Sequence, residues 1–66
     1  MKVGKAIARL RKKTNLTQAE FGKKVGVTQA SLSNIESGNK KPHKSTIQKI
    51  CTMFDIPVQM FNILYG

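Results

Sequence analysis

Four residues near the middle of the chain carry short, uncharged side chains suited to hydrogen bonds and close contact. They are Gln29, Ala30, Ser33 and Asn34, and we call them the reading face. Leu32 and Ile35 have the spacing of a buried helical stripe, so the four residues should face outward together. A neutral polar face of this kind predicts recognition of a hydrogen-bonding partner.

Groups that could carry catalysis or bind a metal are scarce. The chain has one His, one Cys and three acidic residues, too far apart in sequence to indicate a metal site or a catalytic triad. A glycine-rich phosphate loop is also absent from the sequence. We therefore expect no enzymatic activity, no metal, no cofactor and no small-molecule ligand.

The reading face requires two short helices joined by a glycine turn, over residues 17–37. Thr17 and Glu20 have the spacing of a capping box, in which each side chain bonds to the other residue's backbone N–H. Gly26 follows the first helix, at a point where a left-handed conformation costs glycine least. Thr28 is the expected N-cap of the second helix, which carries the reading face.

Apolar spacing predicts three further helices, over residues 3–13, 44–54 and 57–64. Asn15 is a suitable left-handed residue after the first helix, and Pro57 suits the first turn of the last one. In that last helix Val58 and Phe61 should face the core, together with either Leu64 or Tyr65. The expected fold is all-α, a compact five-helix bundle forming a single domain over residues 1–66.

Composition indicates a cytoplasmic chain. The single cysteine, Cys51, cannot form an internal disulfide and is expected to be a buried thiol in a reducing compartment. Apolar runs are shorter than the roughly 18 residues of a membrane helix. The first residues also lack the apolar stretch of a signal peptide.

Positive charge is concentrated in one part of the sequence. The net charge is +9, and residues 1–44 contain eleven of the twelve Lys and Arg residues with only Glu20 and Glu36 to offset them. In the remainder, Lys49 and Asp55 balance. A polyanion is the natural partner for such a surface, and nucleic acid is favoured over an anionic membrane or a merely solvated cationic surface.

The spacing of several residues resembles that of a known DNA-binding family. The residues are Gln18, Gly22, Gly26, Val27, Leu32 and Ile35, with Asn15-Leu16-Thr17-Gln18 before and Ile35-Glu36-Ser37-Gly38 after. This register is similar to the helix-turn-helix of phage repressors and Cro-like (xenobiotic-response-element type) transcriptional regulators, over almost the whole chain. The resemblance implies a lambda repressor-like DNA-binding domain. Asp55 departs from it, because relatives often have glycine there, and the connection should be slightly strained.

The resemblance implies double-stranded DNA as the partner and divides the contacts by role. Base reading falls to the reading face, while the start of the first central helix and the loop after the second should meet phosphates. The expected phosphate-binding residues are Gln18, Thr28, Asn39, Lys40, Lys41 and Lys44. Gln and Asn match the N6/N7 edge of adenine, and Ala can contact a thymine methyl, so we expect direct reading of A·T pairs. Ala30 replaces a longer side chain of some relatives, which favours a contribution from DNA shape.

The sequence also predicts an ion pair between two helices and a surface for a second copy of the chain. Glu36 lies near the C-terminal end of a helix, where the dipole opposes a carboxylate, so it needs a compensating cation. The resemblance places Arg11 there, as the partner in a structural ion pair. On the last helix Met60 and Ile63 should point away from the core, with Pro57 nearby. Contiguous exposed apolar side chains indicate a partner surface, here a two-fold homodimer that forms at least on DNA.

The sequence therefore predicts a bacterial or phage transcriptional regulator, a repressor that occupies operator DNA as a dimer. A restriction–modification controller protein and an antitoxin that represses its own operon are alternatives within DNA binding. A protein–protein adaptor built on the same fold is the alternative of another class.

Overall fold

The two central helices are bounded by capping residues, a threonine before each and a glycine after each. A computed structural model of the protein describes residues 2–65; Met1 and Gly66, the ends of the expected domain, lie outside the described residues. The helices in this range are α1 (Lys2–Thr14), α2 (Gln18–Val25), α3 (Gln29–Ser37), α4 (Lys44–Phe54) and α5 (Val58–Tyr65). These bounds confirm the all-α helix-turn-helix prediction, with α4 as expected and α1 one residue longer at each end.

Both halves of the predicted capping box are formed at the start of α2. The backbone N–H of Glu20 donates to Thr17 Oγ1 at 3.2 Å, and Thr17 N–H donates to Glu20 Oε1 at 2.9 Å. Thr28 caps α3 by accepting from Ser31 N–H at 3.1 Å. Between the two helices, Gly26 adopts the expected left-handed conformation, with φ of 80°.

Two residues other than glycine also adopt a left-handed backbone conformation at the end of a helix. Asn15 (φ 61°) follows α1, and Asp55 (φ 58°) follows α4. The predicted break at Asp55 is therefore present, in a conformation that costs a side chain energy which glycine would not lose. Pro57 precedes α5 instead of forming its first turn: its carbonyl accepts from Phe61 N–H at 3.0 Å, which makes Val58 the first helical residue.

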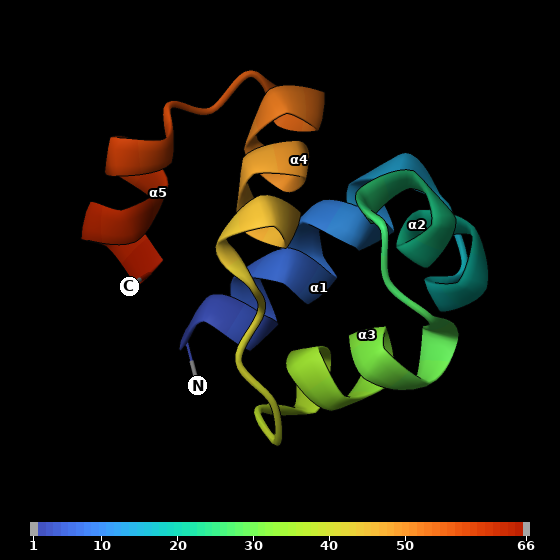
Figure 1. Cartoon of the computed structure of the whole chain (residues 1–66). Coiled ribbons are helices and arrows are strands. Elements are labelled where there is room, and N and C mark those ends of the chain that lie inside the picture. Colours follow the sequence, from blue (N-terminus) through green and yellow to red (C-terminus); the bar gives the residue numbers. More distant parts are fainter. Residues whose placement is uncertain (1, 66) are drawn as a thin grey trace.

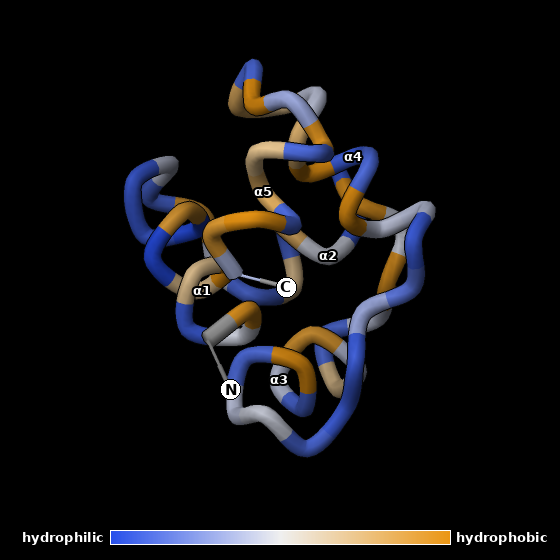
Figure 2. The backbone as a smooth tube through the Cα atoms, turned by 90° about the vertical axis from the view of Figure 1, so that its left-hand side faces the viewer, coloured by the Kyte–Doolittle hydropathy of each residue, from blue (hydrophilic) through white to orange (hydrophobic). Residues whose placement is uncertain are grey.

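The helices enclose one apolar core. α1 packs against α3 and α5, α2 packs against α3 and α4, and α4 packs against α5. In Figure 1, α3 lies along the lower edge, α2 at one side and α5 at the other, with α4 between them. The outer side of α1 is hydrophilic (Figure 2). Buried core residues come from all five helices: Ile7, Phe21, Val25, Leu32, Ile35, Ile50, Cys51 and Phe61.

Gly4 allows α1 to approach the end of α3 closely. A Cβ atom at this position would collide with the backbone carbonyl oxygen of Ile35 and would lie 3.2 Å from that of Glu36. Glycine therefore sets the distance between α1 and the helix that carries the reading face. At the other end of the chain, Tyr65 is the residue that packs inward, whereas Leu64 is 55% exposed.

Candidate nucleic-acid interface

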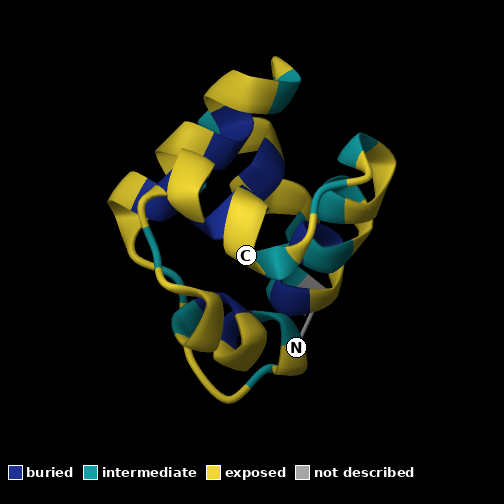
Figure 3. Cartoon of the chain, turned by 90° about the vertical axis from the view of Figure 1, so that its right-hand side faces the viewer, coloured by how far each residue is buried: buried dark blue, intermediate teal, exposed yellow. Residues whose placement is uncertain are grey.

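The reading face forms one exposed arc on α3. Gln29, Ala30, Ser33 and Asn34 are all exposed, while Leu32 and Ile35 on the opposite side are buried. At 3.6 residues per turn the four side chains project within less than half of the helix circumference. Figure 3 shows α3 and the loop that follows it as a largely exposed edge of the molecule.

Ser37 also belongs to this arc and was not among the predicted base-reading residues. It lies three and seven residues after Asn34 and Ala30, which places it on the same face of the helix. It is exposed, and its hydroxyl donates to the backbone carbonyl of Asn34 at 3.1 Å. The helical spacing alone could have identified Ser37.

The loop after α3 brings a cation to a helix that has none of its own. Lys40 Nζ donates to Ser31 Oγ at 3.1 Å, so the ammonium lies over the side of α3. The backbone N–H groups of Asn39 and Lys40 donate to the carbonyl of Asn34, which folds the loop against the helix end. Ser31 was not predicted to take part, because its contact with Lys40 depends on the path of the loop.

The other predicted phosphate-binding residues occupy two ends of the same region. Asn39, Lys41 and Lys44 are exposed on the loop and at the start of α4. Thr28 uses a hydroxyl lone pair to cap α3. Gln18 is half-buried at the first position of α2, and its amide Nε2 donates to Glu36 Oε1 at 3.0 Å. The amide thus has a protein partner that the sequence did not reveal.

Arg11 and Glu36 are joined by two hydrogen bonds. Arg11 Nε lies 2.7 Å from Oε2 and Nη2 lies 3.1 Å from Oε1, with side chains 15% and 9% exposed. Burial works against the charge of Glu36, but the hydrogen bonds from Arg11 and Gln18 outweigh it, and its pKa lies below the ordinary value. Arg11 Nη1 also donates to the carbonyl of Leu16 at 3.0 Å, which ties the α1–α2 turn to α3.

The predicted partner surface on α5 is exposed. Met60 and Ile63 are 50% and 82% exposed, and Pro57 is exposed beside them. Leu64 joins these three residues because Tyr65, not Leu64, turns toward the core. We call Pro57, Met60, Ile63 and Leu64 the α5 patch.

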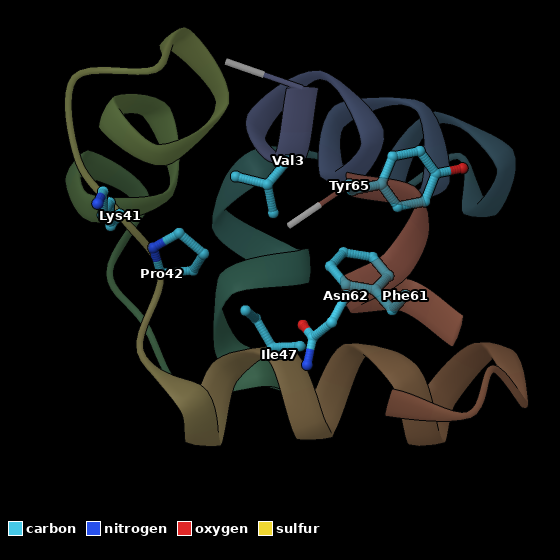
Figure 4. A pocket seen from close by; sticks show the side chains of 7 residues that line it. All are labelled: Val3, Lys41, Pro42, Ile47, Phe61, Asn62 and Tyr65. Carbon is cyan, nitrogen blue, oxygen red and sulfur yellow. The ribbon is translucent and has the colours of Figure 1, made fainter. Parts of the chain in front are cut away.

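A groove of about 250 Å³ separates α5 from the loop after α3. Figure 4 shows Val3, Pro42, Ile47 and Phe61 around it, with Lys41 on the far side of Pro42. The walls are mainly hydrocarbon, so the groove does not resemble a site for catalysis. Within residues 2–65, no cluster of His, Cys, Asp or Glu could hold a metal ion, and no helix is long and apolar enough to cross a membrane.

Comparison with known proteins decides the family. A family model described as helix-turn-helix matches residues 7–61, which include α2, the glycine turn and α3. The chain belongs to the helix-turn-helix family. The match also covers the loop after α3 and the first part of α5, so it takes in nearly every residue discussed above.

Relatives within the family include regulators and an antitoxin. Over 54 residues the chain is 41% identical to the antitoxin PezA of Streptococcus pneumoniae, covering 82% of this chain and 34% of that protein. It is 39% identical, again over 54 residues, to HTH-type transcriptional regulators of Mycobacterium bovis and Mycobacterium tuberculosis, covering 82% of this chain and 21% of theirs. The chain thus spans about a third or less of these curated relatives. No solved structure gives a significant match.

Proposed function

We propose that this domain binds double-stranded DNA sequence-specifically and regulates transcription, as a repressor that occupies an operator. The observation that carries the proposal is the exposed arc of short, uncharged side chains on α3, bordered by Lys40, Lys41 and Lys44. A helix of this width fits the major groove of B-DNA, where neutral amides and hydroxyls can read base edges. Family membership supports the same partner.

Phosphate contacts position α3 in this proposal. The lysines of the loop after α3 and of the start of α4 approach one side of the groove, with Asn39 beside them. Gln18 and Thr28 approach from the starts of α2 and α3, where backbone N–H groups without helical acceptors favour anions. Together these groups fix the register of the protein on the duplex, while the reading face supplies specificity.

The reading face favours A·T pairs. Its amides, Gln29 and Asn34, match the N6/N7 edge of adenine, and Ala30 presents a methyl group suited to thymine. Arginine, the usual partner of guanine, is absent from α3. Ala30 and Ser33 reach a shorter distance than long side chains, so DNA shape contributes to the choice of site.

The operator is bound as a homodimer through the α5 patch. A two-fold contact would bring each α5 against its own copy and shield Met60, Ile63 and Leu64 from water. The two α3 helices would then reach successive major grooves, about 34 Å apart. A contact this small scarcely offsets the entropy lost on association. The dimer therefore forms mainly on DNA.

A bacterial or phage-encoded antitoxin-type autoregulator, acting in the cytoplasm, is the second candidate. The similarity to PezA favours it, since the matched 54 residues include the whole helix pair. In this case the same DNA-binding surface would control the operon that encodes the domain. Binding of the domain to duplexes taken from its own promoter region, compared with duplexes from elsewhere in the genome, separates the two candidates.

Selection of bound duplexes from a random library tests the proposed function. We expect an enriched, A·T-containing, two-fold symmetric site. Its affinity should fall with salt by a logarithmic slope of about −0.9 for each neutralised phosphate. A protein–protein adaptor would enrich no sequence and would show little salt dependence. That result would overturn the proposal.

A further inference from the structure

One carboxylate connects three parts of the helix-turn-helix. Glu36, in the last turn of α3, accepts from two nitrogens of Arg11 on α1 and from Gln18 at the first position of α2. Its side chain is only 9% exposed. The Gln18 contact is the only one of these that involves a residue expected to touch DNA.

This contact determines which way the Gln18 amide faces. A glutamine amide has two N–H donors and one carbonyl oxygen. Turning the amide over would place its carbonyl oxygen against the negative Glu36 carboxylate, with both groups as acceptors and no proton between them. Glu36 therefore keeps the amide nitrogen of Gln18 turned toward it and accepts a hydrogen bond from one of its two N–H groups. The second N–H stays available for another acceptor.

Further donors lie beside that amide. Thr17 Oγ1 accepts from the backbone N–H of Glu20, and the Thr17 carbonyl accepts from the backbone N–H of Phe21. The backbone N–H groups of Gln18 and Ala19 are left without an acceptor in the helix, as at any helix start. An oriented amide beside two such groups makes a better anion contact than a freely rotating one, because less freedom is lost on binding.

We propose that Glu36 is a positioning residue for DNA binding: it orients the Gln18 amide toward a backbone phosphate and ties that contact to the placement of α3 in the groove. The inference rests on the proposed function and adds a role that neither the ion pair nor the phosphate contact implies alone. Glu36 itself touches no DNA. It acts through Gln18.

A double-mutant cycle measured on DNA affinity tests this role. The probes are a duplex selected by the wild-type domain and a random-sequence duplex of equal length. Gln18→Met removes the amide at nearly constant size and should weaken binding of both duplexes about tenfold, because a hydrogen bond to a charged group is lost and phosphates carry no sequence information. In a Glu36→Gln background, where the amide has lost its anionic anchor, the same change should cost less than twofold.

Arg11→Met is the matched control for general damage to the ion pair. It removes the partner of Glu36 but leaves the Gln18 acceptor in place, so Gln18→Met should still cost about tenfold there. An equal cost of Gln18→Met in all three backgrounds would overturn the inference while leaving DNA binding intact. Absence of any salt-dependent duplex binding by the wild-type domain would overturn the proposed function, and the inference with it.

A second measurement needs no variant that might fail to fold. In the wild-type domain, one side-chain amide proton of Gln18 should resonate downfield by NMR and shift as Glu36 is titrated with acid. Adding the selected duplex should then shift the other amide proton and leave the first in place. Side-chain amide protons of Gln18 whose shifts both stay constant as the pH is lowered, or loss of the first proton's shift on DNA, would contradict the inference.

Discussion

The ring of Tyr65 packs on Phe61, with centroids 5.1 Å apart and planes inclined by 58°. This contact decides which of the last two apolar residues of α5 faces the core. Leu64 lies at the surface, where it extends the α5 patch on the side of Met60 away from Ile63. The patch therefore has one residue more than the three expected from the sequence, Pro57, Met60 and Ile63.

Ile63→Glu should abolish cooperative filling of two half-sites. A carboxylate at an 82% exposed position leaves the fold intact but would face its own copy across a two-fold contact. Cooperativity is measured by titrating a duplex with two half-sites against a duplex with one. Asn62→Asp, an acidic change at an exposed position on the opposite side of α5, is the control and should bind cooperatively. Unchanged cooperativity in Ile63→Glu would place the dimer contact elsewhere.

Breaking the Arg11–Glu36 pair should cost about 3 kcal/mol of unfolding free energy, the lower end for a buried pair, because both side chains retain some exposure. The variants are Arg11→Met, Glu36→Gln and the double change, studied by urea unfolding. We expect the double variant to lose less than the sum of the single changes. Coupling near zero would mean that the pair acts as two solvated charges.

Stability should fall with acid in a way that depends on Glu36. Its folded pKa is lowered, so its contribution is complete above the unfolded value of about 4.3 and is lost as pH falls through the folded pKa. Glu20, whose pKa is lowered by hydrogen bonds from Thr17, loses its contribution in the same direction. Urea midpoints between neutral pH and pH about 2 should fall less steeply in Glu36→Gln than in the wild type. An identical pH profile would contradict the assignment.

Gln29→Ala and Lys41→Ala should impair DNA binding in different ways. Loss of a bidentate contact from Gln29 costs roughly 1–3 kcal/mol at one base pair and relaxes the preference there. Loss of Lys41 should weaken all sequences alike and reduce the salt slope by about one. Lys49→Ala is the charge-matched control, since Lys49 lies over Gly26, at the opposite end of α2 from Gln18. If Gln29→Ala keeps the ranking of all sequences, the reading face has been misplaced.

Gly4→Ala should destabilise the domain although alanine favours helices. The new methyl group would collide with the carbonyl oxygen of Ile35 and push α1 away from α3. We expect a net loss of up to about 2 kcal/mol, because overpacking costs about 1–3 kcal/mol and the gain in helix propensity returns roughly 1 kcal/mol. Thermal unfolding measures the change, and Lys5→Ala at the adjacent exposed position should be nearly neutral. A stabilised Gly4→Ala variant would show that the two helices can separate freely.

Local features of the fold could be predicted because they depend on residues close in sequence. The Thr17–Glu20 capping box, the left-handed Gly26 and the N-cap at Thr28 each involve a span of a few residues, within which side chain and backbone satisfy each other. The outward direction of Gln29 and Asn34 followed from the burial of Leu32 and Ile35 by helical periodicity alone. The same periodicity should have included Ser37.

Contacts between segments that are far apart in the sequence could not be predicted from local patterns. The sequence by itself determined the five predicted helices, the caps of α2 and α3 and the exposed polar face of α3, because backbone hydrogen bonding and apolar spacing are local. Only the tertiary structure decided that Lys40 folds back onto Ser31, that Gln18 donates to Glu36, and that Tyr65 displaces Leu64 from the core. Each of these depends on how close two segments come when the helices pack, and that distance is set by the whole core, including the missing side chain of Gly4.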